Sequence, residues 1–190
     1  MDLSIIIFLL GGLFLGWSLG ANDAANVFGT AVGTRMVRFK TAAIVCSIFV
    51  ILGAIISGAG TTETLGKLGA INALPGAFAA CVAAGISVYL MTKAGLPVST
   101  TQAIVGAIVG WNLYTGSATN IKVLITILGT WVLCPVIAGL IAMGFFTLTK
   151  NFLLKRKLHI LRLDAYTRTA LLFAGAFGAY SLGANNIANV

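Results

Sequence analysis

The sequence predicts an all-α membrane protein: a polytopic bundle of helices that includes broken helices, a helical hairpin and an inverted internal repeat. Of the 190 residues, 59% are hydrophobic and only 8% are charged, whereas a soluble domain carries roughly 25% charged residues. Apolar runs near 20 residues recur along the chain, while barrel strands would alternate over roughly 10 residues. A polar segment occurs twice within these apolar runs.

The apolar runs predict these spans, in chain order: 3–34, 41–58, 73–92, 98–112, 121–149 and 168–184. The first contains a polar motif rich in small residues, and we expect it to be broken there. Residues 59–72 carry two charges and are expected to form a loop.

Residues 73–112 are predicted to form a helical hairpin. The segment 94–101 separates its two arms, and the second arm, with about 15 residues, is roughly 22 Å long at 1.5 Å per residue. This is short for a hydrocarbon core about 30 Å thick. We therefore expect a hairpin that dips into the membrane and returns, with Pro97 near its tip.

The basic residues predict the orientation of the spans. Two basic residues fall on one side, Lys67 and Lys122. Ten fall on the other side: Arg35, Arg38, Lys40, Lys93, Lys150, Lys155, Arg156, Lys157, Arg162 and Arg168. By the positive-inside rule the side with ten is cytoplasmic and the N-terminus is external. If Lys93 lies near the hairpin tip, the count becomes nine against two. If 98–112 fails to reverse direction, the repeats become parallel.

The two polar segments are near copies, Ser18–Val27 and Ser181–Val190. The predicted spans place them on helices that run in opposite directions, so the repeat is inverted. We expect residues 1–149 to form the first repeat, residues 150–167 a basic cytoplasmic connector, and residues 168–190 the start of a second repeat that is cut short.

The motif residues supply hard oxygen ligands inside the membrane, where unpaired polar groups are costly and therefore usually functional. Asn22, Asp23 and Asn26 lie at helical spacing that can share a face, and carboxylate and amide oxygens are ligands suited to Na⁺. The second copy offers Asn185, Asn186 and Asn189 in the same spacing. The alternative is that these side chains only join helices by hydrogen bonds.

A second concentration of polarity is the segment Pro-Val-Ser-Thr-Thr-Gln at 97–102. Proline near the first turn of a helix, followed by Ser99, Thr100 and Thr101, places hydroxyl donors beside unpaired backbone N–H groups and the positive end of the helix dipole. Such an end receives tetrahedral oxyanions well. The alternative is an ordinary Ser/Thr N-cap.

Several other classes of function have little support. The basic residues are spread over short loops, not gathered in a patch with aromatic residues, so no nucleic acid is expected as a partner. No nucleophile triad, zinc spacing or nucleotide loop is present, so we do not expect an enzyme. The cysteines lie in apolar segments and are expected to be small buried residues.

The two copies and the 97–102 segment resemble the motifs of the inorganic phosphate transporter (PiT) family. This resemblance implies a secondary active transporter, a sodium- or proton-coupled symporter of inorganic phosphate about twice this length and commonly a homodimer. It also implies these coupling-ion residues: Asn22, Asp23, Asn26, Gln102, Asn185 and Asn189. The implied phosphate residues are Ser99, Thr100, Thr101 and Asn186. Gln102 stands where many relatives have His, which favours Na⁺ over H⁺ because an amide does not titrate.

The resemblance leaves two alternatives open. A carrier of sulfate or another oxyanion would use the same donors, and a channel or structural membrane subunit could assemble in trans. We expect a multi-pass protein of the plasma (cell inner) membrane that works with a missing C-terminal half and needs no cofactor beyond the transported cation.

Overall fold

The computed structural model describes residues 3–68, 74–96, 98–155 and 159–189. Within them the chain forms seven α-helices and one short 3₁₀ helix: α1 Leu3–Gly33, α2 Phe39–Ser57, α3 Ala59–Gly66, α4 Leu74–Lys93, α5 Thr100–Thr115, α6 Ile121–Lys155, α7 Ile160–Asn186 and η1 Ile187–Asn189. The predicted all-α class is confirmed.

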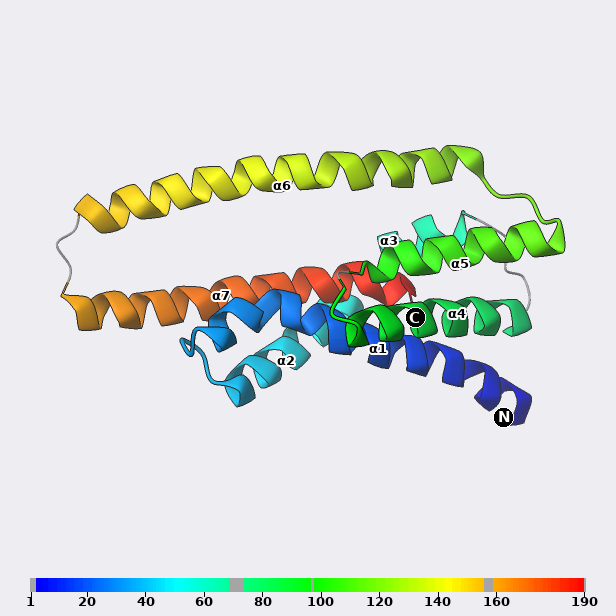
Figure 1. Cartoon of the computed structure of the whole chain (residues 1–190), viewed down its shortest axis with the longest axis horizontal. Helices are drawn as coiled ribbons and strands as arrows, with labels where there is room; N and C mark the ends of the chain where they lie inside the picture. The colour runs from blue at the N-terminus through cyan, green and yellow to red at the C-terminus, as the bar shows by residue number, and fades with distance from the viewer. Residues whose placement is uncertain (1–2, 69–73, 97, 156–158, 190) are drawn as a thin grey trace.

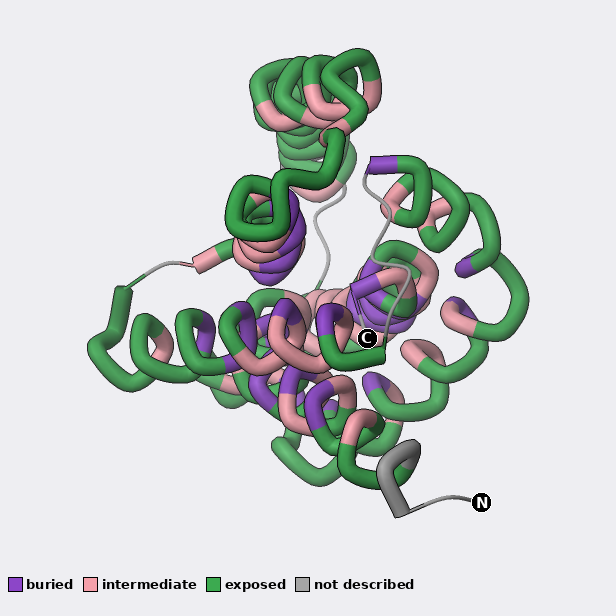
Figure 2. The backbone as a smooth tube through the Cα atoms, turned by 90° about the vertical axis from the view of Figure 1, so that its right-hand side faces the viewer, coloured by how far each residue is buried: buried purple, intermediate pink, exposed green. Residues whose placement is uncertain are grey.

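Four of these helices are long and apolar enough to cross a membrane: Ile6–Gly33, Phe39–Ser57, Leu74–Lys93 and Ile121–Leu153. In Figure 1 α1 and α7 run in opposite directions, as the inverted repeat requires. Helix α6 lies along the outside of the bundle, and Figure 2 shows that exposed residues dominate it, whereas the buried residues concentrate in the layers below.

The first span is not broken, which corrects the sequence-based expectation for residues 3–34. Helix α1 is continuous from Leu3 to Gly33. Three alanines in the motif favour helix, and the polar side chains find partners on other helices without unwinding their own. The interruptions lie elsewhere: at Gly58, between α2 and α3, and at Ile187, where α7 passes into η1.

The expectation of a loop at 59–72 is wrong for its first part. Residues Ala59–Gly66 form helix α3, which lies near the end of α7, and Thr61 Oγ1 donates to the Ala184 carbonyl at 2.8 Å. This contact brings the α2–α3 break next to the second motif copy. The later part of the expected loop, residues 69–73, lies outside the described residues.

Helices α4 and α5 lie side by side and run in opposite directions (Figure 1), as expected of the two arms of a hairpin. Helix α4 ends in a Schellman motif, in which Leu96 N–H donates to the Met91 carbonyl and Gly95 N–H to the Thr92 carbonyl. Gly95 has φ +70°, which favours glycine. Pro97, the expected tip, lies outside the described residues.

Helices α2 and α7 approach each other unusually closely through glycine. A Cβ added to Gly53 would overlap the Tyr180 carbonyl, and one added to Gly183 would overlap the Val50 carbonyl. Small residues permit such backbone contact between membrane helices. The contact holds the end of α7, and with it the second motif copy, against the rest of the bundle.

The helices α6 and α7 extend into the segment expected to be a connector, 150–167. Helix α6 continues to Lys155 and α7 begins at Ile160. At the start of α7 Arg168 pairs with Asp164 at 2.7 Å and donates to the Met36 carbonyl at 2.8 Å. The same guanidinium therefore ties α7 to the segment that joins α1 and α2.

Candidate functional site

The two motif copies meet at Asp23. This carboxylate is buried, with 8% of the residue exposed. Its Oδ2 accepts hydrogen bonds from Thr100 Oγ1 at 3.1 Å and from Asn186 Nδ2 at 2.9 Å. Three segments far apart in sequence, α1, the start of α5 and the end of α7, therefore converge on a single carboxylate.

Asn22 connects the first motif copy to the link between α4 and α5. Its Nδ2 donates to Asp23 Oδ1 at 2.7 Å and to the Val98 carbonyl at 3.2 Å, while its Oδ1 accepts from Thr92 Oγ1 at 3.3 Å. The amide thus fixes the orientation of the carboxylate and holds both ends of the α4–α5 link against α1.

The second motif copy continues this network. Asn186 Oδ1 accepts from Asn189 Nδ2 at 3.0 Å and from Asn185 Nδ2 at 3.3 Å. Asn189 Nδ2 also donates to Thr101 Oγ1 at 3.2 Å. Asn189 lies in η1, so the short 3₁₀ helix after α7 carries the amide that contacts α5.

Three consecutive hydroxyls at the start of α5 have three different surroundings. Ser99 is the N-cap, and its Oγ accepts from the Gln102 N–H at 3.3 Å. Thr100 is buried, and its hydroxyl donates a hydrogen bond to Asp23, whereas the Thr101 hydroxyl accepts a hydrogen bond from Asn189. Ser99 and Thr101 therefore keep their own protons available for another acceptor. The sequence did not distinguish the three.

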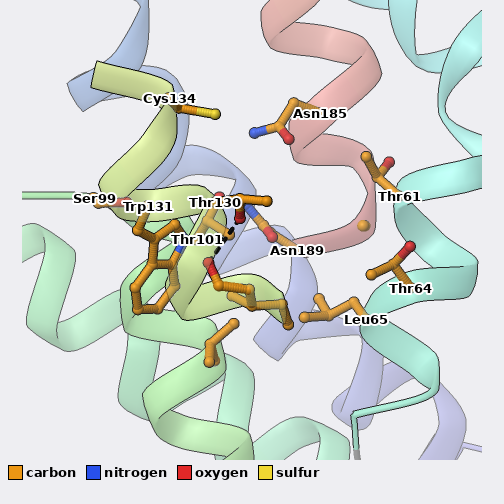
Figure 3. Close-up of a pocket in the computed structure, with 13 residues that line it drawn as sticks. Thr61, Thr64, Leu65, Ser99, Thr101, Thr130, Trp131, Cys134, Asn185 and Asn189 are labelled. Atoms are coloured by element: carbon orange, nitrogen blue, oxygen red, sulfur yellow. Dashed lines mark hydrogen bonds between the residues drawn. The ribbon is translucent and has the colours of Figure 1, made fainter. Parts of the chain in front are cut away.

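Two hollows adjoin these hydroxyls. The first, of about 350 Å³, is lined by residues that include Asp23, Asn26, Ser99, Thr101, Asn185 and Asn186. The second, of about 380 Å³, lies between the end of α7 and helices α3, α5 and α6, and is drawn in Figure 3. Ser99, Thr101 and Asn185 line both hollows and form the wall between them.

Most of the predicted site residues lie in or beside this network. Asn26 and Asn185 are exposed and line the first hollow. Gln102 is also exposed but lines neither of the two hollows, so the structure does not bring its side chain to the other predicted ligands.

The sequence missed the residues that complete the surroundings of the site. Thr92 holds Asn22, and the second hollow has three further hydroxyl residues on its wall, Thr61, Thr64 and Thr130. Thr61 and Thr64 belong to a Thr-Thr-Glu-Thr run in the segment expected to be a loop, and Thr130 lies in an apolar helix, where the usual role of threonine is a bond to the preceding turn of its own helix. Only the packing of α3 and α6 around the motifs reveals them.

Comparison with known proteins places these residues in a family. The model of the phosphate transporter family matches residues 19–167. A protein named as a phosphate permease in Thermococcus kodakarensis is 34% identical over 167 residues, which cover 83% of this chain and 41% of that protein. A sodium-dependent phosphate transporter of Plasmodium falciparum is 33% identical over 156 residues, covering 76% of this chain and 23% of that protein.

A solved structure leads to the same family. The sodium-dependent phosphate transporter superposes with a TM-score of 0.74 at 26% sequence identity, covering 92% of this chain and 54% of that chain. The chain spans about two fifths of the length of the Thermococcus kodakarensis relative. Since the family model matches well over half of its residues, this chain belongs to the phosphate transporter family, whose members are transporters and not enzymes.

Proposed function

We propose that the protein is a secondary active transporter that carries inorganic phosphate across the membrane together with a cation, and that the cation is Na⁺. One observation carries this proposal: a buried carboxylate lies where both motif copies meet the hydroxyls of α5, beside a hollow. The names of the matched relatives support phosphate as the solute, and two of them include sodium.

The cation is proposed to bind at Asp23. Among the described residues no Lys or Arg forms an ion pair with this carboxylate, and a buried charge without a counter-charge is costly. A Na⁺ ion in the adjoining hollow supplies the counter-charge, and amide oxygens of Asn26 and Asn185 can complete its shell. Asn22 and Asn186 would orient Asp23 by their hydrogen bonds to it, and Asn189 would hold Asn186 in place.

Phosphate is proposed to bind at the wall between the two hollows. Ser99 and Thr101 each accept a hydrogen bond from an N–H group, which leaves their own O–H groups as donors. They stand at the start of α5, where the helix dipole favours an anion. The family resemblance assigns Thr100 to phosphate; because its hydroxyl donates to Asp23, we propose that it acts in the surroundings of the cation.

This arrangement gives a physical reason for coupling. Two unit negative charges about 5 Å apart at an effective dielectric constant of about 20 repel by roughly 3 kcal/mol, which weakens binding more than a hundredfold. Phosphate beside an unoccupied Asp23 meets this repulsion, and bound Na⁺ removes it. Binding of each ion therefore strengthens binding of the other.

The test is uptake of radiolabelled phosphate by the full-length protein that contains this chain, expressed in cells that lack their own phosphate uptake. We expect accumulation against the phosphate gradient in Na⁺ medium and little in choline medium at the same pH. Accumulation driven by a pH gradient without Na⁺ would identify H⁺ as the coupling ion. Equal competition by sulfate would favour a general oxyanion carrier, and equilibration without accumulation would favour a channel.

The substitution Thr101→Val should raise the KM for phosphate about tenfold to a hundredfold, because it removes a donor to a charged ligand, worth roughly 1.5–3 kcal/mol. The concentration of Na⁺ needed for half-maximal uptake should change much less. Initial rates over a range of phosphate and Na⁺ concentrations measure both quantities. The matched control is Thr126→Val on α6, whose hydroxyl bonds only to its own helix; an unchanged KM in Thr101→Val would contradict this placement of phosphate.

We also propose that the N-terminus is external and the start of α7 cytoplasmic, from the distribution of basic residues. In the full-length protein freed of native cysteines, Glu63→Cys should react with a membrane-impermeant thiol reagent applied outside, and Arg162→Cys only after permeabilisation. Lys67 lowers the pKa of the Glu63 carboxyl by a hydrogen bond and by its charge. Labelling of both cysteines from one side would reject the orientation. Arg156, also in the basic segment, lies outside the described residues.

A further inference from the structure

The contact between Asp23 and Asn186 locates the axis that relates the two repeats. These residues occupy the same position in the two motif copies, and they hydrogen-bond to each other at 2.9 Å. Equivalent residues of two related units touch each other only where the two-fold axis passes between them. The axis therefore runs between Asp23 and Asn186, and it relates α1 to α7, which run in opposite directions (Figure 1).

On the α7 side of this axis, one face is filled by α2. Gly183 lies against the Val50 carbonyl, and the backbone of Tyr180 and Ala184 lies against Gly53. The Tyr180 hydroxyl bonds to Ser57 Oγ at 2.6 Å. The glycine in the second motif copy thus has a clear function, because any side chain there would separate α7 from α2.

On the α1 side, the equivalent face is open. The residues that correspond to Tyr180, Gly183 and Ala184 are Trp17, Gly20 and Ala21. Trp17 is 59% exposed, and a Cβ added to Gly20 would meet no atom within 4 Å. A hollow of about 600 Å³ runs beside Gly20 and Ala21, lined mostly by small and apolar residues of α1 and α2. No contact within the described residues requires glycine at position 20.

We propose that this open face, defined by Trp17, Gly20, Ala21 and Ala24, binds the helix of the second repeat that corresponds to α2. Rotation about the two-fold axis superposes α7 on α1. The same rotation moves α2 to a position against Gly20, where the helix of the second repeat that corresponds to α2 would lie. The relatives have room for such a helix, because the chain covers 41% of the Thermococcus kodakarensis protein and 54% of the solved transporter. The proposal depends on the repeat and not on which solute is carried.

The chemistry of the face favours a helix over the other possible occupants. Glycine on a membrane helix permits a second backbone to approach closely, whereas a lipid chain packs against any apolar side chain and needs no glycine. A second copy of the protein could cover the face, but the internal two-fold axis already assigns it a partner from the same chain. Each repeat then supplies the helix that packs against the motif helix of the other repeat.

Disulfide cross-linking in the full-length protein tests this proposal. Ala21→Cys is introduced in a background without native cysteines, and a second cysteine is moved through the first hydrophobic span that follows the second motif copy. We expect cross-links within one chain at positions three to four residues apart, as on one helix face. Ala138→Cys, on the exposed side of α6, is the matched control and should not show this pattern. Cross-links only between two chains, or at no position, would overturn the proposal.

A substitution provides an independent readout that does not involve transport. In the full-length protein Gly20→Val should lower the melting temperature in detergent by several degrees, because the added side chain separates the two helices. Gly106→Val is the control, since Gly106 also has open space around it but lies on α5, away from this face. If the two variants melt at the same temperature, no helix backbone approaches Gly20, and the face is covered by lipid or by nothing.

Discussion

Asp23→Asn is expected to reduce Na⁺-dependent phosphate uptake by about a hundredfold or more. The carboxylate receives hydrogen bonds from Thr100 and Asn186 on one oxygen, and the substitution removes both the negative charge and part of this acceptor capacity. The lost charge has the larger effect, because two opposite unit charges no more than about 5 Å apart at an effective dielectric constant of about 20 attract by roughly 3 kcal/mol or more. A tenfold change corresponds to about 1.4 kcal/mol.

The measurement is uptake at saturating phosphate with and without Na⁺, normalised to the amount of protein in the membrane. Asp164→Asn is the matched control, because it makes the same chemical change in an exposed carboxylate that pairs with Arg168 on the surface, and it should keep most of the activity. Uptake in Asp23→Asn that still depends on Na⁺ and stays near the normal rate would exclude Asp23 as the cation ligand.

Gly183→Ala is expected to prevent stable packing of α7 on α2. The added methyl would overlap the Val50 carbonyl, which is backbone and cannot rotate away, so the helices must separate. Overpacking of this kind costs roughly 1–3 kcal/mol, a large share of the stability of a small helical bundle. Since Asn186 and Asn189 lie on the same short segment, separation would also withdraw them from Asp23 and Thr101.

Thermal melting in detergent and the yield of monodisperse protein measure this effect. The control is Gly106→Ala, where the added methyl meets no atom within 4 Å and alanine favours the helix by about 1 kcal/mol relative to glycine. The control should melt at the same temperature as the unmodified protein or higher. If Gly183→Ala has the same melting temperature as the control, the close approach of α2 and α7 does not limit stability.

The positions of the helices could be predicted from the sequence because apolar length is a local property. The runs 41–58 and 73–92 correspond closely to Phe39–Ser57 and Leu74–Lys93. Small residues at the first motif were interpreted as a break, but glycine and alanine also permit close packing in a continuous helix. The sequence alone could not decide between these roles, because the choice depends on which helix lies opposite.

The candidate site was predictable where the polar signal was duplicated. Two copies of an amide-rich segment indicated that both halves contribute, and the structure joins them through Asp23 and Asn186. The different environments of Ser99, Thr100 and Thr101 were not predictable, because they depend on how α7 ends. Gln102 was assigned by family resemblance, and its side chain is exposed in the first turn of α5.

The direct contact between Asp23 and Asn186 also bears on how such a site can arise. In a symmetric dimer of two identical half-length chains, any residue on the two-fold axis faces its own copy. Two aspartates would repel or share a proton, and two asparagines would leave no charge for a cation. A site with one carboxylate and one amide on the axis is therefore possible only when the two halves differ in sequence, so the repeats would have to diverge before such a site could arise.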